Sequence, residues 1–105
     1  MTPCDFVILN QARRDLLAMA GYIAQDSPQS AVRFRKQYRE TIETTCIWPM
    51  ANRLIDELPG LEGRNLRRAI IKGFPNHLMV YDFDGETVRI LRAFHASQEW
   101  AERLR

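Results

Sequence analysis

The sequence has little of what builds metal centres, disulfide frameworks or membrane spans. Its 105 residues include two cysteines, Cys4 and Cys46, and two histidines, His77 and His95. Neither pair has the spacing of metal ligands, so we expect two reduced, buried cysteines, with no metal and no cofactor. The longest apolar runs span only a few residues, which argues against a membrane-spanning helix, and the N-terminus lacks the pattern of a secretion signal. We therefore expect a cytoplasmic protein.

The sequence also lacks a strong excess of positive or negative charge, since the formal net charge is only +2. Such a mild balance does not by itself indicate a nucleic-acid-binding protein. Between residues 65 and 95, however, the three acidic residues gather at one predicted hairpin end, whereas the basic ones lie elsewhere. These basic residues are Arg67, Arg68, Lys72, Arg89 and Arg92. Such a surface suits either RNA or an acidic or amphipathic protein segment.

Two amphipathic helices are predicted after a short N-terminal strand. The apolar run 6–9 is typical of a buried or edge strand, and Asn10 has the side chain of a helix N-cap. Apolar residues at helical spacing then predict a first helix. Ser27 as N-cap and Pro28 at the first position open a second helix, which ends at Trp48. Because only two or three residues join the helices, they should form an antiparallel hairpin.

The stretch 65–95 predicts three strands joined by two tight turns. The turns are marked by residues 73–76 and by Asp84–Gly85, and an Asp-Gly pair is a strong hairpin signal. The segments between them are rich in the β-branched and aromatic residues that strands prefer.

Two further segments complete the prediction. Residues 50–64 contain proline and glycine without a clear period, which indicates a connecting loop with a possible helical turn near 54–58. Ser97 is placed to cap a last short helix. Residues 1–105 are therefore predicted to form one α+β domain of order β-α-α-β-β-β, with a helical hairpin packed on a small antiparallel sheet and a short C-terminal helix.

This order of elements, at this length, resembles the ParE/RelE superfamily of toxins from bacterial type II toxin–antitoxin modules. The motifs that carry the resemblance are Ala12–Leu16, Tyr22–Ala24, Ser27–Pro28 with Ala31 and Phe34, Trp48–Pro49 with Arg53, Leu66–Arg67, Val80–Tyr81 and Val88–His95. They span nearly the whole chain, and their order and spacing are more specific than any single motif. Within the superfamily, the chain is more similar to the ParE branch than to RelE.

The resemblance implies a small toxin that a cognate antitoxin holds inactive. ParE-type toxins inhibit DNA gyrase, whereas RelE-type relatives cut mRNA on the ribosome. One fold here hosts different activities, so the target does not follow from the fold. Our first hypothesis is a non-enzymatic gyrase inhibitor. The alternatives are a ribosome-dependent endoribonuclease and a binding module without toxicity.

The endoribonuclease alternative requires an acid, a base and cations. Metal-free RNA cleavage must activate a 2′-hydroxyl, protonate a leaving oxygen and neutralise phosphate charge. The catalytic candidates are Tyr81, Arg92 and His95, and the phosphate-binding candidates are Arg68, Lys72 and Arg89. In a regular strand, Arg92 and His95 point to opposite faces, so they converge only if a bulge intervenes. The competing roles are a strand-end histidine bound to backbone, a packed tyrosine and solvated arginines.

An antitoxin tail, as the resemblance implies it, is disordered until it binds and then lays an amphipathic segment on the toxin. Such a segment needs an apolar groove with basic rims, which the helical hairpin beside the sheet is able to supply. The antitoxin-binding candidates are Arg13, Tyr22, Arg33, Tyr38, Arg39 and Trp48. The competing interpretation is that the aromatic residues among them pack the core.

Overall fold

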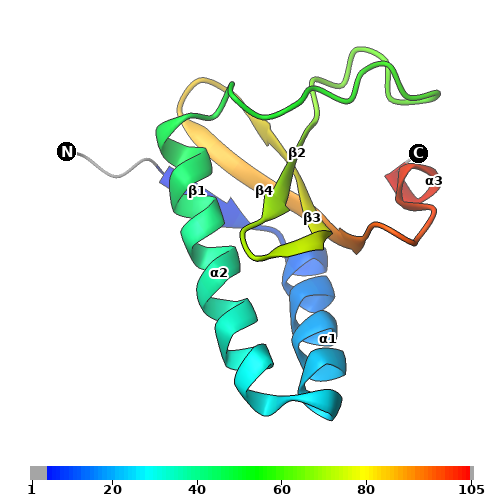
Figure 1. The fold of residues 1–105 in the computed structure, drawn as a ribbon. Coiled ribbons are helices and arrows are strands. Elements are labelled where there is room, and N and C mark those ends of the chain that lie inside the picture. The colour runs from blue at the N-terminus through cyan, green and yellow to red at the C-terminus, as the bar shows by residue number, and fades with distance from the viewer. Residues whose placement is uncertain (1–4, 105) are drawn as a thin grey trace.

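The structure is a computed structural model that describes residues 5–104. The elements in chain order are β1 (Asp5–Ile8), α1 (Asn10–Asp26), α2 (Pro28–Ile47), β2 (Arg67–Ile71), β3 (Phe74–Phe83), β4 (Thr87–His95) and α3 (Trp100–Leu104). The predicted α+β order is confirmed, and the two long helices lie side by side against the sheet (Figure 1).

The four strands form one sheet in the order β1-β4-β3-β2. Strands β2, β3 and β4 make the predicted antiparallel meander. Strand β1 pairs in parallel with β4, with Phe6 opposite Val88. The sheet is therefore mixed rather than wholly antiparallel, because the helical hairpin carries the chain away from β1 before the meander begins. Because β1 is an edge strand, its first three residues, 5–7, are exposed.

Both long helices begin where the backbone leaves an extended conformation. At α2, the prediction is confirmed: Ser27 Oγ accepts a hydrogen bond from the Ser30 N–H at 3.1 Å, and Pro28 is the first helical residue. At α1, the predicted cap Asn10 is wrong, since the N-cap is Leu9 and no side chain caps the helix. The reason is that the Leu9 N–H still bonds the Ile90 carbonyl at 3.0 Å, so the chain belongs to the sheet up to Leu9.

The two predicted turns differ in accuracy. At the second, Asp84 Oδ1 accepts from the backbone N–H groups of Glu86 and Thr87 at 2.9 and 2.8 Å, as an Asp-Gly turn should allow. The first is shorter than the predicted 73–76, because β3 already begins at Phe74. Gly73 adopts a φ of 79°, a conformation that glycine tolerates, so fewer residues reverse the chain.

One face of the sheet is covered by α1 and α2. The helices contribute the side chains that recur at helical spacing, among them Leu16, Ala20, Phe34 and Ile42, which are at most 2% exposed. The strands contribute Ala69, Ile71, Met79, Tyr81, Val88, Ile90 and Ala93. The predicted amphipathic stripes of both helices are thus confirmed as the core on this face.

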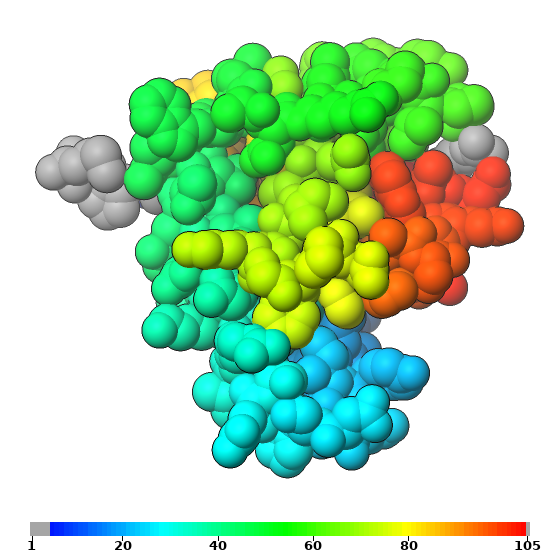
Figure 2. All heavy atoms as spheres, in the orientation of Figure 1, coloured from blue at the N-terminus to red at the C-terminus, as the bar shows by residue number. Residues whose placement is uncertain are grey.

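The opposite face is covered by the segment between α2 and β2, together with α3. Ile55, Leu61, Leu66 and Leu104 pack there against Leu78, Val80 and Phe94. Figure 2 shows the segment after α2, in green, lying along one end of the molecule. Near the expected helical turn, Leu54 forms an isolated β-bridge with Arg67, and the Leu58 N–H then bonds the Ile55 carbonyl at 3.2 Å in a single turn.

A bulge in the β3–β4 pairing overturns the predicted alternation of β4. The register shifts between Val80 and Tyr81. Ile90 and Ala93 consequently both join the helix-covered core, although regular alternation assigned them to opposite faces.

One expectation from composition, the reduced state of the cysteines, is not met at Cys46. Cys46 is disulfide-bonded, so the predicted reduced state is wrong for this residue, because sequence spacing does not reveal the distances that folding creates. The other cysteine, Cys4, lies outside the described residues. Within residues 5–104, no helix combines the length and apolar character needed to cross a bilayer.

Candidate functional site

Tyr81, a candidate proton donor, is buried in the helix-covered core. Its side chain is 0% exposed, and its hydroxyl donates a hydrogen bond to the Pro49 carbonyl at 2.7 Å. Burial raises the pKa of the Tyr81 hydroxyl. The hydroxyl is therefore a neutral group that fixes the backbone after α2.

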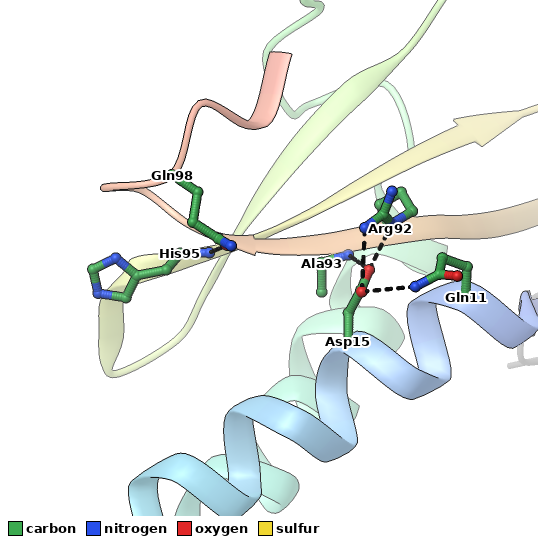
Figure 3. A network of polar contacts seen from close by, with 6 residues as sticks. All are labelled: Gln11, Asp15, Arg92, Ala93, His95 and Gln98. Atoms are coloured by element: carbon green, nitrogen blue, oxygen red, sulfur yellow. Dashed lines mark hydrogen bonds and ion pairs between the residues drawn. The ribbon is translucent and has the colours of Figure 1, made fainter. Parts of the chain in front are cut away.

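Arg92, the second catalytic candidate, pairs with a residue that we did not single out from the sequence. Its Nε donates to Asp15 Oδ2 at 2.8 Å, and the same carboxylate oxygen accepts the Ala93 N–H at 3.0 Å (Figure 3). Burial opposes the charge on Asp15, but the hydrogen bonds from Arg92 and Ala93 outweigh it, so the pKa of this carboxyl is lowered. Asp15 thus joins α1 to β4. The sequence did contain a signal for this role, because Asp15 is adjacent to Leu16 on the inward-facing stripe of α1.

His95, the third candidate, lies opposite the other histidine of the chain. His77 and His95 are paired residues of β3 and β4, and their ring centroids are 4.9 Å apart, edge to face. The Ser97 N–H donates to His95 Nδ1 at 3.1 Å, and Ser97 Oγ lies 2.6 Å from the same nitrogen. Nδ1 therefore acts as an acceptor, which leaves the proton of the neutral imidazole on Nε2.

His77 is held in an aromatic environment. Its ring packs edge to face against Phe34 and Phe74, and its buried Nδ1 has no hydrogen-bond partner among residues 5–104. Burial, followed by the neighbouring His95, lowers the pKa of the His77 imidazole. The pair borders an open cavity of about 450 Å³, together with Ala18, Met19 and Tyr22 of α1.

The fold does not bring the three catalytic candidates together. Tyr81 lies four residues along β3 from His77, the partner of His95, which corresponds to roughly 13 Å. The His95 ring also points away from the Asp15–Arg92 pair (Figure 3). Each of these three groups makes a different structural contact, so the three candidates do not converge on one point.

The phosphate-binding candidates are equally dispersed. Arg89 forms two hydrogen bonds with Asp82, at 2.8 and 2.5 Å. Arg68 lies on β2, on the other side of β3 from Arg89, a lateral separation of roughly 10 Å. Lys72 is exposed in the turn after β2. The three do not form one anion-binding cluster.

The two exposed aromatic antitoxin-binding candidates lie at opposite ends of the helical hairpin. Tyr22, 72% exposed, is near the tip where α1 meets α2, and Trp48, 65% exposed, follows the other end of α2. Roughly 20 Å of helix separates these two levels. The aromatic candidate that packs is Tyr38, which contacts Phe34 with ring centroids 5.7 Å apart.

The basic candidates Arg13, Arg33 and Arg39 are exposed along the same hairpin. The Arg33 guanidinium lies 5.4 Å from the centroid of the Phe74 ring. Among residues 5–104, no three side chains of His, Cys, Asp or Glu gather as a metal site would require.

The fold and this surface are those of a small α+β protein with exposed aromatic residues. Comparison with known proteins identifies the family. Residues 6–100 match the family described as "ParE toxin of type II toxin-antitoxin system, parDE". The match covers most of the chain, so the protein belongs to the ParE toxin family.

A solved structure supports the fold assignment. The chain is similar to a structure titled "Chromosomal ParDE TA system from P. aeruginosa", with a TM-score of 0.68. Sequence identity is 16%, and the alignment covers 90% of this chain and 98% of the other. At that identity the similarity concerns the fold alone. No curated protein shows significant sequence similarity to the chain.

Proposed function

We propose that this ParE-family toxin is neutralised by a cognate antitoxin and inhibits DNA gyrase by binding it, without catalysing a reaction of its own. Its place of action is the cytoplasm, where gyrase works on DNA. The observation that carries the non-enzymatic part is the dispersal of Tyr81, Arg92 and His95, each held by a separate contact. An RNA-cleaving site needs such groups within hydrogen-bond reach of one substrate.

The exposed aromatic residues support the binding part of the proposal. Tyr22 and Trp48 are largely exposed, whereas aromatic side chains that only stabilise a core are buried. Aromatic residues of this kind dominate the energetics of many protein interfaces. The antitoxin-binding candidates at both ends of the hairpin therefore stand as proposed contacts.

The proposal is tested by measuring gyrase supercoiling of relaxed plasmid with purified toxin, first alone and then after addition of its antitoxin. We expect inhibition that antitoxin relieves. The His95→Ala variant, with its fold verified by circular dichroism, should inhibit as strongly as the wild type. Unimpaired supercoiling by a toxin preparation that still arrests growth would contradict the gyrase proposal.

A further inference from the structure

The segment that follows α2 presents apolar side chains to solvent on a fixed backbone. Ile47, Trp48 and Met50 are 46%, 65% and 63% exposed. We call residues 47–53 the Trp48 turn. Within it, the Trp48 N–H bonds the Thr44 carbonyl and the Ala51 N–H bonds the Trp48 carbonyl.

Two side chains from the sheet hold this turn from beneath. The Tyr81 hydroxyl donates to the Pro49 carbonyl at 2.7 Å, and one Arg67 nitrogen donates to the carbonyls of Asn52 and Met50 at 2.7 and 3.2 Å. Strand β2 adds a further bond, from the Arg68 N–H to the Arg53 carbonyl. The exposure of Trp48 is therefore not the looseness of an unattached loop.

Basic groups lie beside the turn. Arg53 belongs to it, and Arg67 and Arg68 adjoin it on β2. Glu57 pairs with Arg53, and the charge of Arg68 also reaches Glu57. Neither Arg67 nor Arg68 takes part in a salt bridge among residues 5–104. The surface thus combines an exposed tryptophan and methionine with positive charge that is only partly balanced.

We propose that the Trp48 turn is the docking site for an acidic segment of the antitoxin, whose apolar side chains cover Trp48 and Met50 and whose carboxylates pair with Arg67. This proposal rests on the proposed function for the existence of the antitoxin. Complementary charge selects an acidic partner and speeds association. A backbone that is already fixed lowers the entropy cost of binding, and a rigid tryptophan is a typical binding hot spot.

The experiment is calorimetric titration of the full-length toxin with its antitoxin at low and at physiological salt. The Trp48→Ala variant should bind roughly 30-fold or more weakly, as hot-spot residues do. The control is Val32→Ala, which shortens an apolar side chain of α2 that is 68% exposed near the other end of the hairpin and should change affinity less than threefold. Arg67→Gln should weaken binding less than Trp48→Ala and should reduce its dependence on salt.

Further measurements distinguish a wrong docking site from a wrong proposed function. Met50→Ala repeats the test with a smaller change, and thermal unfolding verifies that each variant is folded. If Trp48→Ala and Met50→Ala both bind within threefold of the wild type, the docking site is wrong although an antitoxin exists. If wild-type toxin does not bind antitoxin at all, the proposed function itself fails. Tighter binding of a short single-stranded DNA than of antitoxin, lost in Trp48→Ala, would instead make the turn a nucleic-acid surface and overturn the proposal.

Discussion

The two faces of the sheet are buried in different ways. On one face, two regular helices supply side chains at helical spacing. On the other face, a segment without regular secondary structure and the five-residue helix α3 supply Ile55, Leu61, Leu66 and Leu104. The comparison shows that a segment with the composition of a loop can be half of a core.

The largest effect is expected from a substitution that creates a cavity in the irregular layer, compared with the same substitution on the helix-covered face. Leu61 is 0% exposed, and Leu16, on the helix-covered face, is 2% exposed. If both layers are true cores, Leu61→Ala and Leu16→Ala should each lower the free energy of unfolding by about 2–5 kcal/mol. Urea denaturation measures both. A loss below about 1 kcal/mol for Leu61→Ala alone would mean that the second face is only loosely covered.

The second prediction concerns the joint between the helix layer and β4. Asp15→Asn weakens the interaction with Arg92 and Ala93, so we expect a loss of about 2 kcal/mol in unfolding free energy. The control is Asp82→Asn at the more exposed Arg89 pair, with an expected loss of about 0.5 kcal/mol. Equal losses of unfolding free energy in the two variants would show that the Asp15–Arg92 interaction stabilises the fold no more than the exposed Asp82–Arg89 pair.

The same carboxyl predicts a pH dependence. Because the pKa of Asp15 is lowered in the folded state, its contribution is complete above the ordinary aspartate range and is lost as the pH falls below about 4. The stability difference between wild type and Asp15→Asn, followed by denaturation across that range, should therefore shrink towards acid. A difference that stays constant would contradict this assignment.

A smaller effect is expected where the helix-covered core supports the Trp48 turn. Tyr81→Phe removes the hydrogen bond to the Pro49 carbonyl and should cost about 1 kcal/mol. Fluorescence anisotropy of Trp48, measured in a Trp100→Phe background, should fall as the turn loosens. Tyr22→Phe, whose exposed hydroxyl has no comparable role, is the control and should leave both quantities unchanged.

The smallest effect is expected at the histidine pair. The pKa of His77 is lowered by burial, so the unfolded chain binds this proton more readily than the folded one. Stability should therefore decline as the pH falls below about 6.5 and level off once folded His77 is also protonated. NMR titration can follow both imidazoles, since the chain has two histidines. An upward-shifted His77 titration would contradict the assignment.

The core on the helix-covered face can be predicted from the sequence, whereas the core on the opposite face cannot. The helix-covered core was readable, because Leu16, Ala20, Phe34 and Ile42 recur with a helical period. The core formed by the irregular layer could not be predicted, because its buried residues follow neither a helical nor a strand period. They are positioned by tertiary contacts such as the Leu54–Arg67 bridge.

The candidate site was predicted in its residue types but not in its arrangement. Alternation along β4 fails at the bulge, which no local signal marks, so Ile90 and Ala93 share a face that regular alternation would divide. The pairing of His77 with His95 depends on strand register, and that of Asp15 with Arg92 joins residues 77 positions apart. Such contacts are set by tertiary structure rather than by spacing.

Bacterial growth shows whether this chain acts as a toxin that an antitoxin holds inactive. The chain is induced alone, and then together with the antitoxin of its own module, while colony-forming units are counted. We expect growth arrest by the chain alone and recovery when the antitoxin is present. Normal growth at full expression of the folded chain, or an arrest that antitoxin fails to relieve, would contradict it.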